Sequence, residues 1–368
     1  MNQAVRGIHD EIRRSAIGAI PFVRFMELAL YHPDYGYYMS EKVKVGKEGD
    51  FYTSATVHPV FAETLADAII RIWQEEGYSR PALVEIGGGT GILMKHLAAR
   101  IYEAAPLLAD RMRLVMIESS PYHRECQRQA LAGCQADVVW YAAVEEAVQS
   151  EAIEGVILSN EWFDAFPVHL VKRQAAGWTE AGVTWDEGEG CLKWMDLPAL
   201  TPEAADYLAE EKLALPTGMQ LEINLGMRRA IHEVSRMLVR GYVITIDYGG
   251  LQDELYSARR MSGTLQCYYR HRAHDDPLVF VGEQDITAHV NFSALMKWGE
   301  EAGLVPVSLE SQSQFLVKAG ILQKLREHQD TNPFTSEAMR SNQAIRQLIS
   351  PDGMGGTFRV LTQKKDAR

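Results

Sequence analysis

The sequence of 368 residues is poor in cysteine, in basic charge and in long apolar runs. Its four cysteines form no CxxC pair, which excludes a zinc knuckle or a disulfide framework and favours a reducing compartment. With 37 basic against 49 acidic residues, it lacks the positive field that nucleic-acid or anionic-membrane binding requires. No run approaches the ~20 uninterrupted apolar residues of a membrane span, and residues 1–14 lack the apolar stretch of a signal peptide. We therefore expect a cytoplasmic protein with no nucleic-acid or membrane partner.

Apolar residues make up 46% of the sequence, which is enough for a substantial buried core. Runs rich in β-branched residues alternate with stretches of helical period, and this pattern is typical of a parallel sheet covered by helices. The seven expected strands are 82–86, 113–117, 138–141, 155–159, 242–246, 305–309 and 357–362. The sequence therefore predicts an α/β fold with a seven-stranded, mostly parallel sheet of Rossmann-like type.

Three segments do not follow this alternation. Residues 1–80 contain a turn-rich patch of tyrosines and an amphipathic helix, and we expect an N-terminal helical cap before a core of 81–368. Short runs separated by glycines at about 168–220 indicate antiparallel hairpins. A polar, histidine-rich stretch at 248–290 is predicted to form a lid or wall inserted between two core elements.

The first expected strand ends in a glycine-rich turn that opens a helix. Glycines let a ligand touch the backbone, and the helix N-terminus supplies free N–H groups. A dinucleotide fingerprint fails in both registers, because Ile92 and Met94 stand where its last small residue is required. The remaining pattern, an acid followed by alternate glycines, is that of class I S-adenosylmethionine-dependent methyltransferases. It consists of Glu85, Gly87, Gly89 and Gly91.

The second expected strand ends at Glu118, where a carboxylate can accept both hydroxyls of a ribose. Open α/β sheets bind their ligands at such strand ends. We therefore expect S-adenosylmethionine to bind with its methionine tail at residues 85–91, where Glu85 orients its ammonium group, and its ribose on Glu118. A Gly-Asp turn with nearby hydroxyls offers further contacts to this cofactor, from Gly49, Asp50, Thr53 and Ser54.

Acidic residues follow the fourth expected strand. Asn160 ends that strand, and Glu161 and Asp164 are spaced to project from one side of a helical turn. DNA and glutamine amino-methyltransferases carry Asn-Pro-Pro-Tyr here, whereas no proline follows until Pro167, which disfavours base methylation. The two carboxylates can hold a guanidinium or deprotonate a hydroxyl, and His289 is a candidate general base. We take these three as candidate catalytic residues and Asn160 as a cofactor contact.

Each of these assignments has a structural alternative. A capping asparagine with solvated acids explains residues 160–164, and a buried histidine satisfied by a neighbour explains His289. His271, His274 and Asp275 form an HxxHD pattern, but a metal site needs three or more convergent ligands with a supporting shell. We therefore expect no metal.

Segments spread over nearly the whole chain resemble one known family. They are the glycine turn and residues 22–38, 49–54, 160–167, 247–249, 285–292 and 351–361. On these segments the sequence is similar to the MidA-like methyltransferases, a family that includes a mitochondrial complex I assembly factor. The resemblance implies a class I methyltransferase fold, S-adenosylmethionine as cofactor and, from the mitochondrial member, a protein arginine as methyl acceptor.

Two departures from that family bear on the acceptor. Ala55 and Thr56 stand where the family usually has Pro-Glu, and residues 87–91 read Gly-Gly-Gly-Thr-Gly in place of Gly-Pro-Gly-Arg-Gly. Two alternatives to a protein methyltransferase therefore stay open. A small-molecule O- or N-methyltransferase predicts a closed apolar pocket, and an assembly factor that binds the cofactor without turnover predicts an intact fold with no activity.

Overall fold

The computed structural model describes residues 2–42, 44, 58–328 and 336–367. All seven predicted strands lie in one sheet, in the order β15-β16-β10-β5-β2-β3-β4. Their bounds are β2 Ala82–Ile86, β3 Arg113–Ile117, β4 Asp137–Tyr141, β5 Ile153–Asn160, β10 Leu238–Gly250, β15 Val305–Ser311 and β16 Phe358–Lys365. The two-residue strand β14 (Val290–Asn291) also pairs with β10, so the described sheet has eight strands rather than the seven predicted. The predicted α/β class is confirmed.

The direction of the strands creates a binding crevice. Strands β4, β3, β2, β5 and β10 are parallel, whereas β16 runs antiparallel to both β10 and β15. Strand β2 has β3 on one side and β5 on the other, so the connections leaving β2 and β5 diverge at this point. In an open α/β sheet, such a switch point leaves a crevice at the carboxyl ends of the strands.

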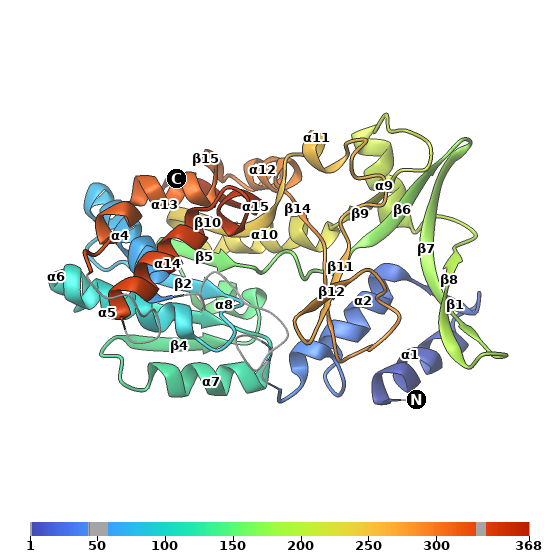
Figure 1. Ribbon diagram of the computed structural model, residues 1–368, viewed down its shortest axis with the longest axis horizontal. Coiled ribbons are helices and arrows are strands. Elements are labelled where there is room, and N and C mark those ends of the chain that lie inside the picture. Colours follow the sequence, from blue (N-terminus) through green and yellow to red (C-terminus); the bar gives the residue numbers. More distant parts are fainter. Residues whose placement is uncertain (1, 43, 45–57, 329–335, 368) are drawn as a thin grey trace.

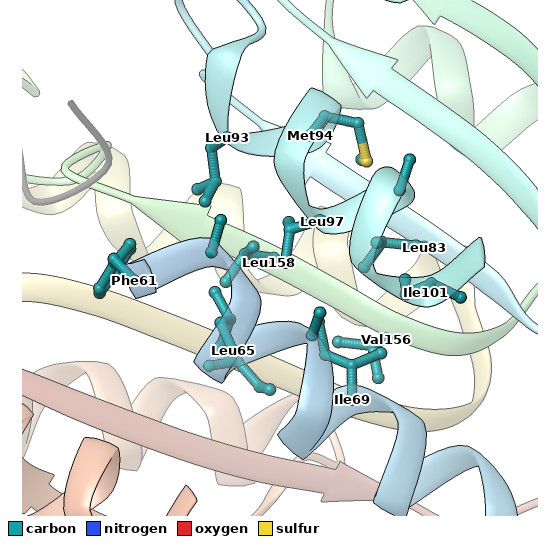
Figure 2. Close-up of a cluster of buried hydrophobic side chains, with 14 of the residues drawn as sticks. Phe61, Leu65, Ile69, Leu83, Leu93, Met94, Leu97, Ile101, Val156 and Leu158 are labelled. Carbon is teal, nitrogen blue, oxygen red and sulfur yellow. The ribbon is translucent and has the colours of Figure 1, made fainter. Parts of the chain in front are cut away.

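Helices cover both faces of the sheet (Figure 1). On one face lie α4 (Pro59–Glu76), α5 (Ile92–Ala104), α13 (Gln312–Ala319) and α14 (Glu337–Ile349). On the other lie α8 (Val144–Ser150), α9 (Pro202–Glu211), α10 (Leu225–Met237) and α12 (Phe292–Glu301). Figure 2 shows the first layer, in which Leu65 and Ile69 of α4 pack with Leu97 of α5 over Leu83 of β2. Because side chains alternate along a strand, Val84 belongs to the opposite layer.

The segment 1–80 divides between two parts of the molecule. Helix α4 lies on the main sheet, whereas α1 (Gln3–Arg14) and α2 (Phe22–Tyr31) pack against the antiparallel hairpins, together with β1 (Ala19–Pro21). The short helix η1 (Tyr37–Met39) follows α2. The residues predicted as one helical cap therefore do not form a single unit.

The two predicted insertions contain antiparallel strands. The first holds β6 (His169–Gln174), β7 (Gly177–Asp186), β8 (Cys191–Asp196) and β9 (Gln220–Ile223). The second holds α11 (Gln252–Leu255) and a small sheet of β11 (Gln266–Tyr269), β12 (Arg272–His274) and β13 (Asp285–Thr287). Buried residues of this small sheet share a hydrophobic cluster with α1 and α2, so the second insertion joins the N-terminal helices (Figure 1).

Shorter elements complete the chain. They are α6 (Pro106–Ala109), α7 (Pro121–Leu131), η2 (Ile321–Lys324) and α15 (Met354–Thr357). In the described part of the chain, no helix has both the length and the apolar character needed to cross a bilayer.

Candidate functional site

A cavity of about 1220 Å³ lies at the carboxyl ends of β2 and β5. Its wall brings together most of the residues that the sequence singled out, namely Glu85, Gly87, Gly89, Glu118, Asn160, Glu161, Asp164 and His289. Gly91 does not line the cavity and instead caps the N-terminus of α5. Gly49, Asp50, Thr53 and Ser54 lie outside the described residues, as do Ala55 and Thr56.

The turn between β2 and α5 needs glycine for its backbone and for close contacts. Gly87, Gly89 and Gly91 have φ values of 68°, 50° and 79°, in the left-handed region that favours glycine. A Cβ at Gly87 would lie 2.8 Å from Cδ1 of Trp162. The glycine turn therefore rests directly on the residue that follows Glu161.

Glu85 is a buried carboxyl at the centre of this region, with an exposed fraction of 2%. Its Oε2 has no hydrogen-bond partner among the residues that the structure describes. Burial raises the pKa of Glu85 to about 8, and the nearby Glu118 adds to the shift. A buried acceptor oxygen beside a cavity suits an ammonium group, which would hold Glu85 in its charged form.

Glu118 follows β3 and contacts the glycine turn. Its Oε2 accepts the N–H of Gly89 at 3.2 Å, and its Oε1 accepts the N–H of Ser120 at 2.9 Å. Burial raises the pKa of Glu118 to about 7, although these two bonds favour the charged form. Gln127 of α7 also supports the turn, because its Nε2 donates to the carbonyl of Gly89 at 2.9 Å. Sequence reasoning missed Gln127, which nothing in its local pattern indicated.

A tight turn follows β5 and carries the two acids. Glu161 has φ 52°, which is rare for a residue with a side chain, and its N–H donates to the carbonyl of Ile246 at 2.9 Å. Asp247 of β10 accepts the next three backbone N–H groups, those of residues 162–164, at 3.0 to 3.4 Å from its Oδ2. One carboxyl group therefore holds the whole turn in place.

Asp247 is itself fully buried. Burial, followed by repulsion from Asp164 and Glu161, raises its pKa well above the usual range, and the backbone N–H groups that it accepts oppose this shift. The sequence offered Asp247 only as part of a family resemblance. Its role depends on a contact between segments more than eighty residues apart, which no local pattern reveals.

The side chains of the turn point to the same cavity. Nδ2 of Asn160 donates to Oε1 of Glu161 at 3.0 Å. The hydroxyl of Tyr248 donates to Oδ2 of Asp164. Oδ1 of Asp164 has no partner within the described ranges, and burial raises the pKa of Asp164 to about 6. This buried, partly unsatisfied acid is a candidate contact for a cationic or hydroxyl group.

His289 lies in the cavity wall, in edge contact with Tyr248. Burial and, to a lesser extent, the neighbouring Arg260 lower the pKa of His289 to about 4. Arg260 donates to Nδ1 at 3.1 Å, so the neutral ring carries its proton on Nε2. This geometry favours a role for His289 as a hydrogen-bond donor through Nε2 over the role of general base that the sequence suggested.

The HxxHD residues do not converge. His271 lines the cavity, whereas Nδ1 of His274 accepts the N–H of Asp276 at 3.4 Å. Among the described residues, no three His, Cys, Asp or Glu side chains form a group that can hold a metal ion.

Comparison with known proteins decides the family. Residues 64–309, more than half of the chain, match the family model described as "Putative S-adenosyl-L-methionine-dependent methyltransferase". The chain belongs to this family. The predicted enzyme class, cofactor and family resemblance are therefore confirmed.

Solved structures agree with this assignment. A protein from Burkholderia thailandensis, crystallised with S-adenosyl-homocysteine, is 36% identical to this methyltransferase. The two superpose with a TM-score of 0.88, and the match covers 99% of this chain and 92% of that one. A second crystal structure from the same organism is 35% identical with a TM-score of 0.85 at the same coverage.

Curated relatives correct one prediction. The mouse and human proteins named "Protein arginine methyltransferase NDUFAF7, mitochondrial" are 27% and 26% identical to this methyltransferase. Each match covers 95% of this chain and 82% or 81% of the relative. The prediction of a cytoplasmic location rested on cysteine usage and on the absence of a membrane span and a signal peptide. Because these relatives are named as mitochondrial proteins, it is wrong.

Proposed function

We propose that this methyltransferase transfers a methyl group from S-adenosylmethionine to the guanidinium of a protein arginine. The observation that carries the proposal is the position of Glu161 and Asp164 in the same cavity as the glycine turn. Two carboxylates match the planar fork of a guanidinium, which offers parallel N–H donors. The curated relatives named as protein arginine methyltransferases support the same acceptor.

The residues around the glycine turn fit the cofactor. The unsatisfied Oε2 of Glu85 suits the ammonium group, and the carboxylate of Glu118, which lines the same cavity, would accept the ribose hydroxyls. Asn160, at the end of β5, lines the same cavity as these groups and the acids of the next turn. When bound, S-adenosylmethionine supplies an electrophilic methyl group.

In this proposal the acids of the turn orient the acceptor and take up its proton. Glu161 and Asp164 hold the guanidinium so that one nitrogen attacks the methyl carbon in line with the sulfur. A C–N bond forms as the C–S bond breaks, and the methylated nitrogen releases one proton. A carboxylate with a pKa near 6, such as Asp164, is suited to accept that proton at neutral pH.

The small-molecule alternative predicts a closed apolar pocket. The acceptor end of the cavity instead carries Glu161, Asp164 and Asp285, three acidic side chains. Negative charge in this position favours a cationic acceptor over a neutral one.

Transfer of a labelled methyl group tests the proposal. The purified protein is incubated with methyl-labelled S-adenosylmethionine and a lysate from cells that lack the corresponding gene, and the labelled protein is hydrolysed to amino acids. We expect label in methylarginine, and roughly 10²-fold less label with Glu161→Gln. Label confined to small molecules or to other amino acids would contradict the acceptor, and its complete absence with a bound cofactor would favour the non-catalytic assembly factor.

A further inference from the structure

A further buried carboxyl group, that of Asp285, lines the cavity that holds Glu161 and Asp164, and sequence reasoning assigned it no role. Asp285 begins β13 in the second insertion, and its exposed fraction is 3%. Its Oδ1 accepts the hydroxyl of Tyr38 at 2.7 Å and the N–H of Ile286 at 2.9 Å. Asp285 and Tyr38 both line the cavity, although they are 247 positions apart in the chain.

Asp285 and Tyr38 are connected to the turn after β5 by two series of contacts. The ring of Tyr38 stacks on that of Tyr31 with centroids 5.5 Å apart, and the hydroxyl of Tyr31 donates to the carbonyl of Ala165 at 2.9 Å. From the insertion itself, the N–H of Ala288 donates to the carbonyl of Asp164 at 2.9 Å. Segments from the N-terminal helices, the main sheet and the insertion therefore converge on one place.

The two acids are close enough to act on the same phenols. Burial, then Asp285 and Asp164, raise the pKa of Tyr31 well above its usual range. The pKa of Tyr248 is also raised well above its usual range, mainly by burial and next by the same two carboxyl groups. These tyrosines remain protonated and add no charge of their own, and the hydroxyl of Tyr248 donates to Asp164 whereas that of Tyr31 donates to the carbonyl of Ala165. We call this part of the cavity the acceptor subsite. It combines the buried carboxyl groups of Asp164 and Asp285 with the flat rings of Tyr31, Tyr38 and Tyr248.

One atom of this subsite calls for a ligand. Asp164 has an exposed fraction of 5%, and its Oδ1 has no partner among the residues the structure describes. A buried acceptor oxygen without a donor is costly, and a cation that enters the subsite removes that cost. Aromatic faces beside the acids favour a planar cation by cation–π and stacking contacts.

We propose that Asp285, held by Tyr38, is a specificity-determining residue that admits a planar cation to the acceptor subsite together with Asp164. This inference deepens the proposed function, on which it rests for the naming of arginine. Asp285 selects by charge, since a neutral group of the same shape brings no positive charge to the two buried carboxyl groups.

The test compares an arginine with its neutral isostere. N-acetylarginine methylamide, the citrulline analogue and the lysine analogue are titrated by calorimetry into the full chain saturated with S-adenosyl-homocysteine. We expect the arginine probe to bind at least about 10-fold tighter than the citrulline probe. Asp285→Asn should reduce this preference to below about 3-fold, whereas Asp275→Asn, an exposed acid in the same insertion, should leave it intact.

Further measurements separate folding from selection. The affinity for S-adenosyl-homocysteine should be unchanged in Asp285→Asn, and Tyr38→Phe, which removes one hydroxyl, should weaken the arginine preference in part. Equal binding of the arginine and citrulline probes, or an intact preference in Asp285→Asn, would overturn the inference. So would the failure of both cations to bind. Binding of the lysine probe in place of the arginine probe would retain a cation subsite but contradict arginine as the acceptor.

Discussion

Glu161 combines an unfavourable backbone conformation with a position in the cavity wall. We predict that Glu161→Gln, which keeps the volume and removes the charge, lowers turnover by roughly 10²-fold because it weakens the hold on the acceptor in the transition state. The affinity for S-adenosyl-homocysteine should scarcely change. Calorimetry and the labelling assay measure both quantities, with Glu203→Gln, an exposed acid on α9, as the control. A large loss of cofactor affinity with normal turnover at saturation would place Glu161 in the cofactor site instead.

Asp247 acts at the same scale through the backbone that it holds. In Asp247→Asn, the amide nitrogen must face either the N–H of Tyr248 or the N–H groups of residues 162–164, because both oxygens now accept such donors. We predict a loss of about 1–3 kcal/mol in the free energy of unfolding, from the donors left unsatisfied. Turnover should fall as the turn loosens.

Urea denaturation measures the loss for Asp247→Asn. The control is Asp137→Asn at the exposed start of β4, for which we expect no change. If Asp247→Asn matched the wild type in both stability and turnover, Asp247 would not position the turn.

At the scale of elements, the loop after β2 and the turn after β5 depend on each other through one close contact. An alanine at Gly87 would bring its Cβ within 2.8 Å of Trp162, whereas a Cβ at Gly89 would meet no described atom within 4 Å. Both substitutions strain a left-handed backbone by about 1 kcal/mol. We predict that only Gly87→Ala also displaces the acidic turn.

The pair of variants is compared at saturating S-adenosylmethionine. There, Gly87→Ala should show the lower turnover, and Gly89→Ala should act mainly on cofactor affinity. Equal turnover of the two variants at saturation would show that the contact with Trp162 has no functional consequence.

Secondary structure was predictable where the local pattern was strong. Each of the seven predicted strands is an apolar run buried on both faces or at a sheet edge. Helical spacing of apolar residues is a weaker guide to the ends of a helix, because the spacing of α10 continues to Ile223, which belongs to β9, and to Leu238, which begins β10. Strand β14 was missed since two residues carry no periodicity.

The site was predictable only where one strand end supplies its residues. Glu85 lies in the last two residues of a strand of the parallel sheet, and Glu118 and Glu161 each follow a strand, so the fold class alone places them together. Tyr38 and Asp285 meet through tertiary packing of segments that resemble ordinary loop sequence. Of the tyrosines in residues 31–38, Tyr31 and Tyr38 pack against the cluster of the N-terminal helices and also line the cavity.

For the whole molecule, buried acids control how stability depends on pH. Glu85 and Glu118 have pKa values raised to about 8 and about 7, so the folded state retains protons that the unfolded state releases near pH 4.5. Their contribution is fully present below pH 4.5 and is lost as the pH rises through their folded values. His123 and His289, with pKa values lowered to about 4, have the opposite effect, which is complete by about pH 6.5.

Between pH 6.5 and pH 8 the acids therefore dominate, and we predict that the free energy of unfolding of the ligand-free protein falls. Urea denaturation across this interval measures the fall. Glu85→Gln should reduce the fall, because a glutamine cannot titrate, and the remainder belongs to the other buried acids with raised pKa values, such as Glu118 and Asp247. A rise in stability over the interval, or an unchanged slope in Glu85→Gln, would show that Glu85 is not protonated in the folded state.

The central claim is that this chain methylates a protein arginine, and quantitative mass spectrometry of methylated peptides tests it most directly. Cells that lack the gene are compared with the same cells carrying the wild-type gene or Glu161→Gln. The account predicts at least one methylarginine peptide that is lost in the deletion, restored by the wild-type gene and not restored by Glu161→Gln. Identical methylarginine peptides in all three strains, together with a methyl difference on a small molecule or another side chain, would contradict it.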